Sequence, residues 1–222
     1  ASLLLAGIAS MAMADDSKAR AEAEGKKPPA SPGWTVIEED WWFPLRYDFL
    51  DSLHRARAHY RAREEKAAAG EIDKAITWLK YAQSHADKET AGELSTARAD
   101  LMDYSMALKS GRPILAKNLD AAFAHASAAL AKHHHFKSSK ALAKNDLKTA
   151  GNHLMAAADH LRAAARSANH EYGSEIVTIY DDYAPYGFWD ETIEFNASIL
   201  GKNLTTIDSE LTKLATKLKS GR

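Results

Sequence analysis

The chain has 222 residues, a formal net charge of −1 and no cysteine, with 45% hydrophobic and 27% charged residues. This balance is ordinary for a globular protein, and the near-neutral charge argues against nucleic acid as the main partner, because phosphate binding requires a surplus of Lys and Arg. The lack of cysteine excludes disulfides, thiolate metal sites, covalent haem attachment and thiol catalysis.

The first 14 residues, ASLLLAGIASMAMA, have the pattern of a secretory signal peptide. A short apolar run, Leu3 to Ile8, precedes Ala12-Met13-Ala14, which matches an A-x-A cleavage site, and two aspartates follow. The alternative is a short buried helix. The pattern favours export, and so predicts a periplasmic or extracellular protein. No run of some 18 apolar residues occurs, so the mature chain is expected to have no transmembrane helix. Residues 15–33 are charged and rich in Ala and Pro, as in a flexible linker.

Two segments dense in aromatic residues, 34–49 and 174–189, are expected to be extended or looped. Pro44 and the lack of a helical period indicate this for the first, and Val, Ile, Tyr, Pro and Gly for the second. They either lie across the ends of the fold or form a docking surface, because Trp and Tyr bury large areas at interfaces. The candidate partner-binding residues are Trp34, Trp41, Trp42, Phe43 and Tyr47. The expected partner is another copy of the chain or another envelope protein.

Apolar residues that recur every three or four positions predict helices over most of the remaining chain. Breaks are expected at Gly70, near residue 87, at Gly111-Arg112-Pro113, at Asn145-Asp146 and at Gly173, and the last helix spans about 190–218. Nothing in the pattern resembles a sheet. The predicted fold is all-α: an antiparallel helical bundle of five to six helices in a single domain, residues 34–222.

An internal similarity at an offset of 75 residues aligns residues 52–85 with residues 127–160. It includes two histidine pairs, His59 with His134 and His85 with His160, and it places Gly70 opposite Asn145. Our interpretation is a duplicated helical hairpin, with repeats at about 50–90 and 125–165.

The stretch from Ala141 to Ala150, ALAKNDLKTA, followed by Leu154 and Ala157, resembles the YfdX-type family of exported helical bacterial proteins. The resemblance implies a helical fold and an exported location. It implies no particular activity.

All ten histidines lie on predicted helices. If the two hairpins pack face to face, His59, His85, His134 and His160 would approach one level of the bundle, and His153 would be a further donor on the same face as His160. Imidazoles bind transition metals, and two of them can ligate haem b. The alternative is local packing of half-exposed rings, because helical metal centres usually add Glu-x-x-His motifs and none occurs here. In the run 133–135, one ring is expected to point inward and two outward.

No catalytic motif is present: the chain lacks a G-x-S-x-G nucleophile motif, a phosphate-binding glycine loop and a dinucleotide fingerprint. An enzyme is therefore disfavoured. The first hypothesis is an exported non-enzymatic protein of the cell envelope that acts by self-association or partner binding. The alternative is a bundle that binds a transition metal or haem through its histidines.

Overall fold

The computed structural model describes residues 46–183 and 194–220, all within one unit, Trp41–Arg222. Over these ranges the structure is all-α, as predicted, and contains no strand. The helices are α3 (Asp48–Arg61), α4 (Glu65–Ser84), α5 (Lys88–Lys109), α6 (Ala116–Ala143), α7 (Leu147–Ser167), α8 (Ser174–Tyr183) and α9 (Ala197–Ser220). None of them combines the length and the apolar character that crossing a bilayer requires.

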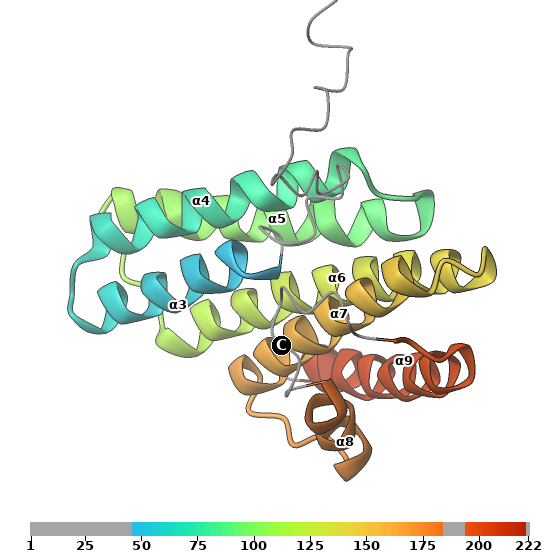
Figure 1. Ribbon diagram of the computed structural model, residues 1–222. Coiled ribbons are helices and arrows are strands. Elements are labelled where there is room, and N and C mark those ends of the chain that lie inside the picture. The colour runs from blue at the N-terminus through green and yellow to red at the C-terminus, as the bar shows by residue number, and fades with distance from the viewer. Residues whose placement is uncertain (1–45, 184–193, 221–222) are drawn as a thin grey trace, which may run out of the picture. The chain divides into compact units, whose positions relative to one another are not determined.

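Helix α6 is the centre of the packing. It contacts α4, α5, α7 and α9, and its most extensive contact is with α7 (Figure 1). Both helices are rich in alanine, and a small side chain lets two helix backbones approach closely. Because α6 has neighbours on several sides, it buries residues around much of its circumference rather than along one stripe.

The buried apolar side chains form two clusters. The first cluster joins α3, α4, α5 and part of α6, and its largest fully buried residues include Phe49 and Phe123. The second cluster joins the rest of α6 with α7, α8 and α9, and includes Leu154, Leu161 and Leu200. Helix α6 contributes to both clusters and so connects the two halves of the core.

The first interhelix turn lies at residues 62–64, so the break predicted at Gly70 is wrong: Gly70 is inside α4. Arg63 has a left-handed backbone (φ 62°), and the Glu64 N–H donates to the His59 carbonyl (2.9 Å). This is the hydrogen-bond pattern of a Schellman motif, which ends a helix without requiring glycine.

The α6–α7 turn repeats this geometry 82 residues later, with Asn145 at φ 59°. An offset of 75 therefore pairs a helix interior with a turn, whereas 82 superposes the turns. At 82, five buried positions of α4 match five of α7: Ala68, Ile72, Ala75, Leu79 and Ala82 with Ala150, Leu154, Ala157, Leu161 and Ala164.

Exchange of Arg63 for asparagine is expected to stabilise the protein. A left-handed backbone costs a residue with a long side chain about 1 kcal/mol or more, and Asn tolerates this conformation better. We expect Arg63→Asn to raise the free energy of unfolding by about 0.5–1 kcal/mol, or about 1–4 °C in Tm, measured by circular dichroism. The matched exchange Asn145→Arg should lower Tm by a similar amount. A lower Tm for Arg63→Asn would contradict the left-handed assignment.

Two other boundaries differ from the sequence prediction. Residues 174–183, expected to be extended or looped, form α8, because Ile176 and Ile179 are buried one helical turn apart and α8 packs against α7 and α9. Tertiary packing here overrides the strand preference of β-branched residues. Helix α7 ends at Ser167 rather than near residue 172, and α9 begins at Ala197 rather than near residue 190.

Candidate functional site: a buried histidine cluster

Four histidines meet inside the protein. His133 and His134 lie on α6, His153 and His160 lie on α7, and their exposed fractions are 1%, 0%, 2% and 0%. We call these four residues the histidine cluster. His153 and His160 are seven residues apart and share a face of α7. His133 and His134 are neighbours in sequence, and both are buried because α6 is surrounded.

His134 is the centre of the cluster. Its Nδ1 lies 3.0 Å from Nδ1 of His153, so one ring donates a proton to the other. The ring of His160 stacks parallel to His134, with centroids 5.4 Å apart and an interplanar angle of 2°. His133 approaches edge-on at 5.4 Å. The Nδ1–Nδ1 contact requires opposite roles for the two nitrogens, so at least one of His134 and His153 is neutral.

The cluster lies where the two apolar clusters meet. Phe49 of α3, in the first apolar cluster, contacts His160 edge-on at 5.7 Å. Leu154 and Leu161 of the second apolar cluster directly follow His153 and His160 along α7. On α5, Thr90 Oγ1 lies 3.5 Å from His133 Nδ1. A polar layer therefore interrupts an otherwise apolar core.

The electrostatic surroundings keep His134 neutral. Burial is the largest cause that lowers the pKa of His134 well below its usual range, and His153, His133, His160 and Lys137 lower it further. No carboxylate is among these causes. A buried imidazolium would thus lack a counter-charge, which is costly in a low-dielectric interior.

The structure brings together three of the five predicted ligands, His134, His153 and His160. His59 instead lies near the end of α3, with Nδ1 2.5 Å from Glu64, and His85 stacks on Tyr81 at the exposed end of α4. The prediction that four helices contribute histidines at one level is wrong for this pair, because it assumed a turn at Gly70. Among the described residues, no three His, Asp or Glu side chains are placed to hold a metal ion.

Sequence reasoning missed His133 and the orientation of the run 133–135. Two of these rings are buried and the third is half-buried, with His135 Nε2 3.1 Å from the Leu204 carbonyl of α9. The expectation of one inward ring is therefore wrong. Identifying the run as buried required knowing that α6 is packed on several sides, which a single-stripe pattern does not show.

Most of the predicted partner-binding residues lie outside the described residues: Trp34, Trp41, Trp42 and Phe43. Tyr47 is described. It immediately precedes α3, is partly buried, and has the Arg46 guanidinium 4.8 Å from its ring centroid. Burial raises the pKa of Tyr47.

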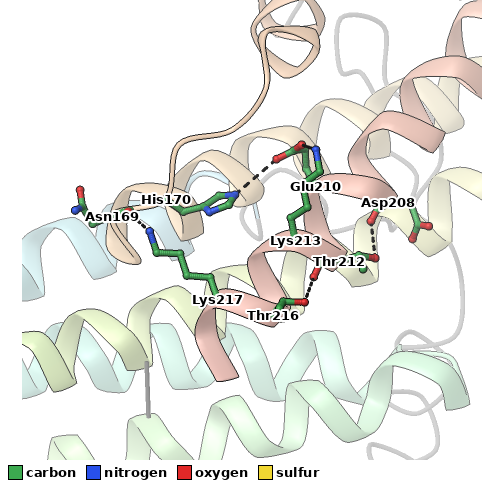
Figure 2. A network of polar contacts seen from close by, with 8 residues as sticks. All are labelled: Asn169, His170, Asp208, Glu210, Thr212, Lys213, Thr216 and Lys217. Carbon is green, nitrogen blue, oxygen red and sulfur yellow. Dashed lines mark hydrogen bonds and ion pairs between the residues drawn. The ribbon is translucent and has the colours of Figure 1, made fainter. Parts of the chain in front are cut away.

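A second polar network joins the end of α7 to α9 (Figure 2). Glu210 is 2% exposed, and its carboxylate accepts a hydrogen bond from Lys213 (2.5 Å) and lies 3.7 Å from His170 Nε2. This hydrogen bond raises the pKa of Lys213. Lys217 donates to the carbonyl of Asn169, which follows α7. Removing a partner of a buried charge is costly, so this network holds the end of α7 against α9.

The fold and the cluster together define a class: an all-α bundle with a titratable layer of imidazoles across its core. Comparison with protein-family models, with curated proteins and with solved structures finds no match to this chain. The resemblance to the YfdX-type family stays a prediction.

Proposed function

We propose that this chain is an exported, non-enzymatic binding protein whose core opens in acid, so that it associates with other copies of itself or with an envelope partner. The observation that carries the proposal is His134, fully buried against three other imidazoles with no carboxylate beside it. The export pattern of residues 1–14 supports an envelope location, where the surrounding pH is less strictly controlled than inside a cell.

The proposed mechanism starts from the groups that face His134. They are His133 and Lys137 on α6, and His153 and His160 on α7; around them, α3 presents Phe49 and α5 presents Thr90. Every titratable group in this set is neutral or positive. A proton added to the cluster is therefore repelled rather than stabilised, and it favours states in which the imidazoles reach water.

Opening at this layer has a defined structural consequence. The cluster lies between α6 and α7, whose alanine-rich contact is the largest in the described residues. Separating these helices would expose apolar surface from the second apolar cluster, and contiguous exposed apolar surface promotes association. The same event thus links acid to binding without a catalytic step.

The alternative of a metal or haem site receives less support, because His59 and His85 lie apart from the cluster. The pairs that do converge are stacked ring on ring, whereas a metal ion requires nitrogen lone pairs aimed at one point.

The proposal is tested by measuring dye binding and mass as a function of pH. Between pH 7.5 and pH 4.5, we expect 8-anilinonaphthalene-1-sulfonate fluorescence to rise and light scattering to report a larger mass, both reversing on neutralisation. His134→Leu should shift both transitions to lower pH, whereas His54→Gln, at an exposed position on α3, should leave them unchanged. A monomer that binds no dye at pH 4.5 would overturn the proposal.

A further inference from the structure

A crevice of about 280 Å³ lies between α3 and α7, on the side chains of α6. Leu50, Leu53 and Arg57 line it from α3, and Arg162 and Arg166 line it from α7. Ser127 contributes from α6. The volume suits a ligand of a few heavy atoms, well below the range of drug-sized pockets.

Arginine side chains from two helices converge on the crevice. Arg57 is held in place by Asp120 (Nε–Oδ1 2.7 Å) and by Ser167, whose Oγ accepts from Nη2 at 2.9 Å. These bonds leave the Nη1 donors of Arg57 available. Arg162 and Arg166 are one turn apart on the same face of α7.

Two carboxylates also line the crevice, and each has a cation of its own. Asp51 pairs with Arg55, and Asp159 accepts from Arg46 at 2.6 Å. Arg162 adds a second, longer contact to Asp159 (3.5 Å). Once Arg46 and Arg55 are assigned to these carboxylates, Arg162 and Arg166 remain as surplus positive charge.

Ser127 supplies an independent indication of a ligand. It is fully buried, lines the crevice, and its Oγ has no hydrogen-bond partner among the described residues. A serine inside a helix ordinarily donates to the carbonyl four residues earlier. A buried hydroxyl without a partner costs about 1–3 kcal/mol, which an acceptor in the crevice would recover.

We infer that this crevice binds a small oxyanion of phosphate size. Arg162, Arg166 and the Nη1 group of Arg57 supply charged donors, and the Ser127 hydroxyl supplies a neutral donor from the floor. Arginine clusters bind such anions because planar guanidinium groups donate paired hydrogen bonds to oxygen atoms. The site is separate from the histidine cluster and does not depend on the proposed function.

Calorimetric titration with inorganic phosphate tests the inference, at pH 7.5 and at an ionic strength fixed with NaCl. We expect saturable binding to the full chain, and competition by sulfate, which has the same shape. The double variant Arg162→Gln/Arg166→Gln should weaken the affinity by about tenfold or more, because it removes two charge-assisted donors. Ser127→Ala should weaken it about 2- to 10-fold, as expected for one neutral hydrogen bond.

Arg61→Gln is the matched control, since Arg61 is an exposed arginine at the end of α3 and does not line the crevice. Its affinity for phosphate should equal that of the unchanged chain. Circular dichroism of each variant checks folding, and the α7 arginines are on the surface, so the double variant keeps its core. Heat that never saturates, or an unchanged affinity in the double variant or in Ser127→Ala, would overturn the assignment.

Discussion

The variant His134→Leu is expected to lose less stability in acid than the unchanged protein. Histidine titrates near pH 6.5 in an unfolded chain, and burial lowers the folded-state pKa of His134 well below that range. Below pH 6.5 the unfolded state therefore binds a proton that the folded state refuses. The stabilisation is fully present above this pH and is lost as the pH falls, by about 1.4 kcal/mol per pH unit.

Between pH 7.5 and pH 4.5, His134 alone should cost the unchanged protein about 2.7 kcal/mol of unfolding free energy. Urea denaturation at both pH values measures this loss, and His134→Leu should show a loss smaller by about that amount. Stability at pH 7.5 is not the readout, because removing the ring also takes the hydrogen-bond partner from His153. The decisive quantity is the difference between the two pH values within each protein.

His54→Gln is the control for this comparison, because it removes an exposed histidine and should keep the acid sensitivity of the unchanged protein. Carboxylates also contribute to acid unfolding, but they are the same in all three proteins. Equal losses in His134→Leu and in the unchanged protein would mean that His134 takes up its proton without opening the fold, and would contradict the proposed mechanism.

Replacement of Phe49 by alanine is expected to be the most destabilising single exchange near the cluster. Phe49 is fully buried in the first apolar cluster, and its ring lies edge-on to His160. Deleting a buried phenylalanine side chain typically costs about 3–5 kcal/mol, from lost burial and from the cavity that remains. For a chain of this length, that corresponds to about 6–20 °C in Tm, measured by thermal unfolding at pH 7.5.

Leu50→Ala is the neighbouring comparison on α3, because Leu50 is only partly buried against the same cluster. Its expected cost is about 1 kcal/mol. Similar Tm values for Phe49→Ala and the unchanged protein would show that α3 is not docked at the histidine cluster, and would remove one wall of the proposed site.

The sequence could predict the helices whose ends carry clear signals. Helix α5 was expected to span about 89–109, and α6 to end near Ala143; both agree with the structure to within about a residue. Gly111 and Asn145, which have left-handed backbones in the structure, stand at these breaks. At the first turn, the same left-handed position is occupied by Arg63, which carries no such signal, so the break was misplaced to Gly70.

Periodicity along this chain was enough to establish an all-α protein, since apolar residues every third or fourth position leave only helices as the way to bury them. Tertiary structure alone decided which histidines meet. His59 and His85 had the same apparent claim to a shared site as His134 and His160, and the difference arises because α6 is packed on several sides while the ends of α3 and α4 face water. Burial on more than one face of a helix depends on how many neighbours surround it, and a one-dimensional pattern does not contain that number.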